Sequence, residues 1–395
     1  MARALLPGEE ATPLPEALVS SVLLFPVLLS LAAQAEDAPL KLGLSFQPRL
    51  TATLDGDPDA SDQQAVTDAG LRVRRILVTV NGTLAERIEY RFRANLANAF
   101  SFTDADGKGQ QASKPVLDDA QVVFRIADPL QVSAGQWKVP FTASQAMSDT
   151  TLLLPDRPIV LDGFKLGDVK VDGFSWSRDA GVAVQGHVAE KRLEYAVGAF
   201  NGDGQNTWPP TDEAPLLAGR VQVAPLGEMK YDEVDLARGA PRLAIGLSGA
   251  HEAPALFSDA GARDGGTSDL RAGADLRLTV RGLSVQAEGL YGRSQVEGVD
   301  EDVTRTGLYA QVGYCLPVGV APGLRWSRLD PTTLSEDDTL SQFEGVLNWY
   351  LPDPAKEGGN LGHKAQLQLH WATTTMEGVD HPLAHQVQLA AAVGI

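Results

Sequence analysis

Long stretches of alternating apolar and polar residues recur along this chain. The first, LKLGLSFQPRLTATL over residues 40–54, alternates apolar residues such as Leu42 and Leu44 with polar ones such as Gln47 and Arg49. Successive side chains of a strand point to opposite faces, so the pattern predicts a strand with one apolar and one polar side. Strands of soluble proteins usually have about 5 to 6 residues. This stretch is more than twice as long, and its length needs a physical reason.

About sixteen segments carry the same two-residue period, and none outside the N-terminus has a helical period. They lie at residues 40–54, 71–80, 88–96, 120–126, 130–141, 180–188, 192–200, 218–224, 242–250, 270–280, 283–291, 307–316, 322–328, 341–351, 365–371 and 385–395.

The connections between these segments alternate in length. Four long ones, after the first, third, fifth and seventh segments, span residues 55–70, 97–118, 142–178 and 201–217. The three between them are short, at residues 81–86, 127–129 and 189–191. Outer-membrane barrels have this arrangement, with long external loops and short periplasmic turns. Residues 225–241 and 352–362 would then be unusually long periplasmic turns.

A bilayer explains the strand length. Every backbone N–H and C=O group inside a membrane must be satisfied within the protein, and a closed barrel of tilted strands of about 9 to 11 residues does this. We therefore predict an all-β, transmembrane antiparallel β-barrel of about sixteen strands in the outer membrane of a Gram-negative bacterium. A soluble sandwich or propeller is the alternative, because alternation with one apolar face also suits those folds.

The barrel prediction assigns a face to each residue of the first strand. Pro48 lacks a backbone donor and predicts a bulge or an exposed end there. The residues expected to face lipid are Leu42, Leu44, Phe46 and Leu50, and those expected to face water are Ser45, Gln47, Arg49 and Thr51.

The N-terminus resembles an export signal. Residues 22–31 form a mostly apolar core, and Ala33-Gln34-Ala35 is a small-residue cleavage site before Glu36. We expect residues 1–35 to be a signal peptide and residues 36–395 to be a single outer-membrane barrel domain. Cys315 is the only cysteine, so no intrachain disulfide is possible.

The position of the charges is more informative than their sum. The net charge of −18 argues against a nucleic-acid partner. Acidic residues gather in the expected loops, as in DGDPDASD from Asp55, whereas arginines and lysines dominate the polar faces of the strands. Guanidinium groups in a narrow passage favour anions and suit carboxylate or phosphate. The predicted pore-lining selectivity residues are Arg49, Arg91, Arg93, Arg125, Lys138, Arg220, Arg271 and Arg277.

Several alternatives accompany this prediction. The arginines could pair with lumenal carboxylates across neighbouring strands and only fix the wall. The barrel could be a non-selective porin, or an adhesive or structural protein whose acidic loops bind partners. No histidine lies in a hydrolase motif, so we expect no enzyme and no cofactor. We expect no metal either, because the calcium-loop spacing that starts at Asp55 has Ala60 and Val66 where Gly and Glu are required.

Several motifs resemble, in order, landmarks of the phosphate-selective porin O and P family. They are GQWKVPF (135–141), RDAG (178–181), YAVGAFNG (195–202), GRV (219–221) with APLG (224–227), GLYAQVGY (307–314), RWSRLDP (325–331) and NWY (348–350).

The resemblance extends over roughly residues 40–395 and implies a sixteen-stranded outer-membrane porin, usually trimeric, that passes small anions such as phosphate. It also implies a long third loop folded into the pore, for which residues 142–178 are the candidate. The sequence departs from the family in two places. It ends in Ile395 where such barrels usually end in Phe, and residues 142–178 hold few lysines although phosphate-binding members use basic clusters at the constriction.

Overall fold

The computed structural model describes residues 40–55, 66–99, 102–103, 109–110, 116–166, 169–207, 215–252, 268–295, 302–355 and 359–394. The predicted signal peptide lies outside these residues, as do Ile395 and most of the DGDPDASD stretch. No helix within the described ranges is long and apolar enough to cross a membrane.

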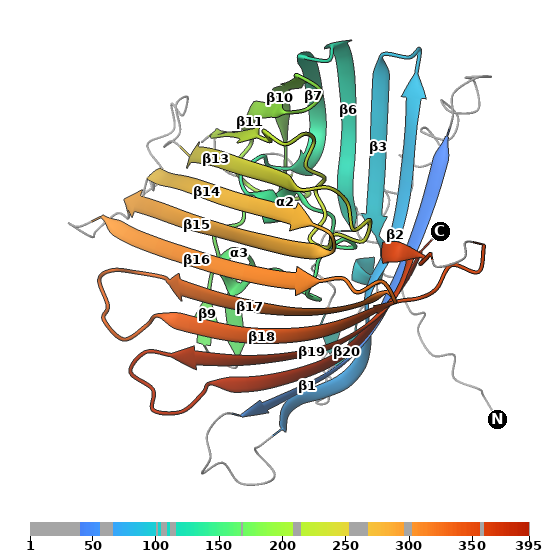
Figure 1. Cartoon of the computed structure of the whole chain (residues 1–395). Coiled ribbons are helices and arrows are strands. Elements are labelled where there is room, and N and C mark those ends of the chain that lie inside the picture. The colour runs from blue at the N-terminus through green and yellow to red at the C-terminus, as the bar shows by residue number, and fades with distance from the viewer. Residues whose placement is uncertain are drawn as a thin grey trace, which may run out of the picture.

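Sixteen antiparallel strands of the described chain close into a barrel (Figure 1). Each strand pairs with its neighbours in sequence, and the first pairs with the last. Every segment predicted as a strand overlaps one strand of the wall, so the predicted fold class and strand number are confirmed. The strands are β1 (Lys41–Asp55), β2 (Val66–Leu84), β3 (Ile88–Asn95), β6 (Leu117–Ala127), β7 (Leu130–Lys138), β10 (Arg178–Val188), β11 (Leu193–Phe200), β12 (Leu216–Val223), β13 (Arg242–Glu252), β14 (Ser268–Val280), β15 (Leu283–Gln295), β16 (Val303–Tyr314), β17 (Val320–Asp330), β18 (Leu340–Tyr350), β19 (Ala365–Met376) and β20 (Ala384–Gly394).

Short elements lie in the connections between these strands. They are η1 (Leu96–Ala99), β4 (Phe102–Thr103), β5 (Gly109–Gln110), α2 (Ala143–Ala146), α3 (Ile159–Asp162), β8 (Phe164–Leu166), β9 (Val169–Val171) and η2 (Gly362–Lys364).

The two faces of β1 differ as the alternation predicts. Leu42 is 58% exposed and Leu50 is 48% exposed, whereas Gln47 is 8% exposed and Arg49 is 3% exposed. The apolar residues therefore form the outer surface of the wall, and the polar residues point into the barrel.

Pro48 lies at an irregularity of the wall. Gln47 pairs with Arg75, but Pro48 pairs with Val73, so the register between β1 and β2 shifts by one residue. A proline cannot donate to the ladder and is tolerated in a sheet at such bulges. The predicted bulge is confirmed, and Arg74 is the extra residue on the facing strand.

Replacing Leu50 by Arg would test the lipid-facing assignment. The change places a charge in the middle of the outer face of β1, so we expect a loss of about 2–4 kcal/mol of unfolding free energy. Leu84→Arg, at the end of β2, is the matched control and should cost only about 0–1 kcal/mol, because that end lies near the membrane interface. Denaturant unfolding of barrels refolded in lipid vesicles measures both losses. Equal losses at the two sites would contradict the assignment.

The connection between β7 and β10 runs through the interior of the barrel in its described residues, 139–166 and 169–177, and we call these the inner segment. Figure 1 shows its α2 and α3 in the space that the strands enclose, and α3 contacts β16 and β17. The Leu153 carbonyl accepts hydrogen bonds from Asn348 Nδ2 at 2.9 Å and Gln368 Nε2 at 3.4 Å. Backbone groups of the inner segment are thus satisfied by inward-facing amides of the wall.

Glycines on the wall make room for the inner segment. A Cβ added at Gly313 or Gly323 would lie 2.9 or 2.8 Å from the methyl groups of Leu153. Both distances are shorter than an ordinary van der Waals contact, so a larger residue at either position would displace the Leu153 side chain. Buried apolar side chains of the inner segment and the wall form two clusters among the described residues. One contains Leu153 and Leu154. The members of the other include Phe141, Val160, Leu161, Phe174, Tyr309 and Leu329.

Candidate functional site

Two cavities lie on opposite sides of the inner segment. The first, which we call the turn-side cavity, has a volume of about 1040 Å³ and is lined by residues beside the short turns, such as Glu89 and Lys191. The second, the loop-side cavity, has a volume of about 460 Å³ and reaches Arg271 and Arg305, near the long connections. Among the described residues, Lys138 is the one side chain that lines both. Lys138 therefore lies where the two cavities adjoin.

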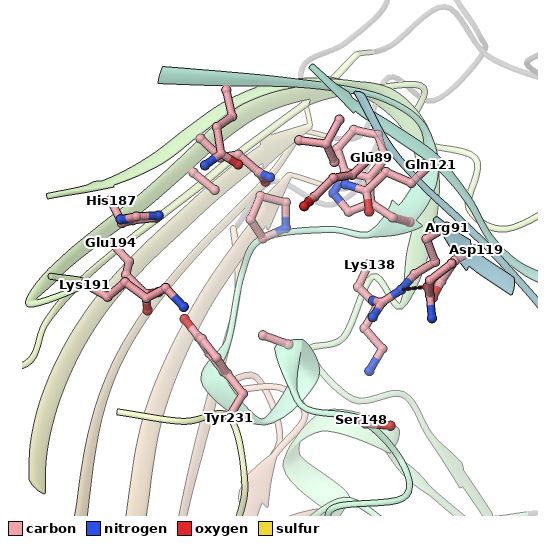
Figure 2. A pocket seen from close by; sticks show the side chains of 18 of the residues that line it. Glu89, Arg91, Asp119, Gln121, Lys138, Ser148, His187, Lys191, Glu194 and Tyr231 are labelled. Carbon is pink, nitrogen blue, oxygen red and sulfur yellow. Dashed lines mark hydrogen bonds between the residues drawn. The ribbon is translucent and has the colours of Figure 1, made fainter. Parts of the chain in front are cut away.

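Figure 2 shows the turn-side cavity with Lys138, Arg91 and Asp119 on one side and His187 and Lys191 on the other. Lys138 is the last residue of β7, and its Nζ donates to the carbonyl oxygen of Met147 in the inner segment. A carbonyl orients the ammonium group without cancelling its charge.

Arg178, the register partner of Lys138, begins β10. Its Nε donates to Asp119 Oδ1 at 2.7 Å, and its Nη2 lies 3.5 Å from Asp118 Oδ2. Asp118 is shared with Arg93, whose Nε lies at 3.4 Å. Two neighbouring carboxylates of β6 thus bind arginines from two other strands.

The inner segment supplies two further carboxylates. The Asp149 carboxylate lies 3.7 Å from Arg75 Nε and 3.4 Å from Arg93 Nη2, both of the wall. It also pairs with Arg157 of the inner segment itself. These contacts fix the middle of the inner segment against β2 and β3.

Asp156 makes the second set of contacts. Its carboxylate lies 2.5 Å from Arg49 Nη1 and 3.6 Å from Arg74 Nη2. Arg74 and Arg75 are adjacent, so a regular strand would point them to opposite faces. The bulge opposite Pro48 places an extra residue on β2, and both arginines reach the inner segment.

The carboxyl groups of Asp149 and Asp156 stay ionised. Burial disfavours the charged form of Asp149, but Arg157, Arg75 and the other nearby cations hold its pKa well below its usual range. The pKa of Asp156 is likewise lowered, because Arg49 and Arg74 outweigh the effect of burial.

Cations outnumber carboxylates in this cluster. Its six arginines share four carboxylates, and Lys138 adds a seventh positive charge. The arginines are Arg49, Arg74, Arg75, Arg93, Arg157 and Arg178, and the carboxylates are those of Asp118, Asp119, Asp149 and Asp156. Asp162, which lines the loop-side cavity, does not cancel the excess.

Other predicted selectivity residues lie outside this cluster. Arg91 lines the turn-side cavity and donates to Asn81 Oδ1 at 3.2 Å. Arg125 is half-exposed near a short turn and pairs with Glu89 at 2.6 Å. Arg220 also lines that cavity, but it forms a bidentate pair with Asp275 at 2.5 and 2.9 Å.

Arg271 and Arg277 donate hydrogen bonds to backbone carbonyls of the connections that lie inside the barrel. Arg271 pairs with Asp269 and donates to the carbonyl of Phe174 at 2.8 Å. Arg277 donates to the carbonyl of Lys230 at 2.9 Å.

Sequence reasoning missed several members of the cluster. Absent from the predicted selectivity residues are the cations Arg74, Arg75, Arg157 and Arg178 and the carboxylates Asp118, Asp119, Asp149 and Asp156. For Arg74 and Arg75, the sequence did hold an indication: Pro48, which lies opposite them and marks the bulge. Within the described chain, no group of three His, Cys, Asp or Glu residues could hold a metal ion.

A closed sixteen-strand barrel with an apolar outer surface and a charged interior is the architecture of an outer-membrane channel. The sequence profile described as "Phosphate-selective porin O and P" matches residues 49–320. The chain belongs to this family and is a porin of the Gram-negative outer membrane. The resemblance and the location predicted from sequence are confirmed, and the family and fold are those of a channel rather than an enzyme.

Solved porins share the fold at low sequence identity. The anion-selective porin from Comamonas acidovorans is 11% identical with a TM-score of 0.56, and the alignment covers 91% of this chain and 100% of that one. The outer-membrane channel DcaP of Acinetobacter baumannii is 12% identical with a TM-score of 0.55, covering 91% and 97%. OmpF of Salmonella typhi is 11% identical with a TM-score of 0.55, covering 90% and 97%. Comparison with curated proteins found no significant match.

Proposed function

We propose that this porin prefers anions and passes small ones, phosphate among them, through the two cavities that adjoin at Lys138. The observation that carries the proposal is the excess of cations over carboxylates around the inner segment. Fixed positive charge in a narrow passage with low-dielectric walls concentrates anions and repels cations.

The inward-facing cations of the wall divide into two groups under this proposal. Lys138, Arg91 and Arg93 act on the passing ion, because they line the turn-side cavity and none of them is paired with a carboxylate of its own. Arg220 and Arg325 are each paired bidentately with one carboxylate, Asp275 and Glu344 respectively. They stabilise the wall and contribute little to selectivity.

Phosphate belongs to the proposed solutes for a further reason. The loop-side cavity is lined by Arg178 and Arg305 together with Ser175 and Ser177, and guanidinium and hydroxyl groups are suitable donors for a tetrahedral oxyanion. The family description points the same way. We propose a homotrimer as the assembly, since OmpT of Vibrio cholerae, a porin of similar fold with a TM-score of 0.52, is described in a trimer form.

Reversal potentials of the purified porin in a planar bilayer with a KCl gradient test the proposal. We expect the sign of an anion-selective channel, and we expect added phosphate to reduce the chloride current. A cation-selective sign would refute the anion preference, and a zero potential would indicate a non-selective porin. Protein that folds but never conducts would favour the adhesive or structural alternative.

A further inference from the structure

The connection between β12 and β13, residues 224–241, also enters the barrel, and we call it the inner turn. It starts at the end that carries the short turns, because the N–H of Ala224 donates to the carbonyl of Arg192 at 2.7 Å. A turn of two to four residues would suffice to join two neighbouring antiparallel strands. The additional residues of the inner turn therefore serve something other than connection.

Glu233 joins the inner turn to the inner segment. It is 3% exposed, and its Oε2 accepts a hydrogen bond from the N–H of Leu153 at 2.8 Å. Its own N–H donates to the carbonyl of Thr151 at 3.1 Å. Thr151 Oγ1 donates in turn to the carbonyl of Tyr231 at 3.2 Å. Three hydrogen bonds thus connect two pieces of chain that enter the lumen from opposite ends of the barrel.

The inner turn is also fixed to the wall. Asp235 accepts from the N–H of Gly282 at 2.8 Å, and its own N–H donates to Ser284 Oγ at 2.9 Å. Arg238 donates to the carbonyl of Cys315. Val234 packs in a buried cluster with Leu153, Leu154, Cys315, Ala321, Val346 and Tyr350. Polar and apolar contacts together hold this part of the inner turn against β15 to β18.

The remaining part of the inner turn borders the passage. Met229, Lys230, Tyr231 and Asp232 line the turn-side cavity. Arg277 holds them there, since it donates to the Lys230 carbonyl at 2.9 Å and its guanidinium lies 4.6 Å from the centre of the Tyr231 ring. Figure 2 shows Tyr231 projecting toward Lys191 across the cavity.

We propose that the inner turn is a second constriction element of this pore, and that Glu233 is the positioning residue that holds it and the inner segment together. The route for ions is then confined to the side of the barrel formed by β2 to β12. Loss of the Glu233 contact frees the two elements to move apart, which widens the passage. The proposal requires an open channel and does not depend on anion preference.

Single-channel recording in symmetrical KCl tests it with two substitutions at one position. Glu233→Ala removes the acceptor for the Leu153 N–H, so we expect conductance to rise by about 1.5-fold or more, with frequent steps between levels. Glu233→Gln keeps an acceptor oxygen in place and should stay close to the unaltered channel. Adding Thr151→Val to Glu233→Ala removes another of the three hydrogen bonds and should increase the effect.

Glu228→Ala is the matched control, because Glu228 lies on the same connection and lines the same cavity but pairs with Lys191 of the turn between β10 and β11. It should not produce the stepping. Only preparations that migrate as folded barrels in unheated detergent gels are compared, so that misfolding is not read as widening. Conductance of Glu233→Ala equal to that of the unaltered porin would overturn the proposal, as would equal disruption by Gln and Ala. The reversal potential, measured separately, reports on the proposed anion preference.

Discussion

Replacement of Lys138 by Glu is expected to reverse or abolish the anion preference. Lys138 lines both cavities, and its ammonium group binds only a carbonyl among the described contacts, so no carboxylate bound to it offsets its charge toward a passing ion. Two unit charges about 4 Å apart interact by about 4 kcal/mol at an effective dielectric constant of 20. Part of this is screened by salt, and we expect a fall of at least about tenfold in the Cl⁻/K⁺ permeability ratio, equivalent to about 1.4 kcal/mol.

Reversal potentials in a KCl gradient measure this ratio. Lys364→Glu is the matched control, since it makes the same change in net charge at an exposed residue that lines neither cavity. It should leave the reversal potential nearly unchanged. Equal shifts from the two substitutions would mean that the overall charge of the protein, and not the junction at Lys138, sets the selectivity.

Asp149→Ala is expected to cause the largest loss of stability. The Asp149 carboxylate is shared by Arg75, Arg93 and Arg157, and its side chain is only 9% exposed. Removing one partner of a buried ionic group costs about 3–5 kcal/mol, because the remaining charges stay buried without compensation. The inner segment would also lose its contact with β2 and β3. Denaturant unfolding of the refolded barrel measures the loss.

Glu377→Ala provides the comparison, because Glu377 pairs with Arg328 at 3.5 Å and both side chains are about half exposed. Exposed ion pairs contribute about 0–1 kcal/mol. In the folded fraction, Asp149→Ala should strengthen the anion preference, the opposite of Lys138→Glu, since it removes a negative charge from the cluster. A small loss of stability together with an unchanged reversal potential would show that Asp149 neither anchors the inner segment nor balances the cluster.

The sequence determined the fold of this protein almost completely. A two-residue period held over strands such as β1 and β14 states which side chains face outward, and the bilayer thickness explains why the strands are long. Pro48 even located a bulge. These features are local, because each depends on neighbouring residues and on the membrane as a solvent.

Only the tertiary structure decided which charges remain uncompensated. Arg220 and Lys138 look alike in the sequence, since both lie on polar faces of predicted strands. Asp275 binds Arg220 from two strands away, whereas Lys138 meets a carbonyl of the inner segment. Such pairings join residues far apart in the chain, as in the contact between Arg49 and Asp156. They depend on the path of the inner segment and the inner turn through the lumen, which no local periodicity encodes.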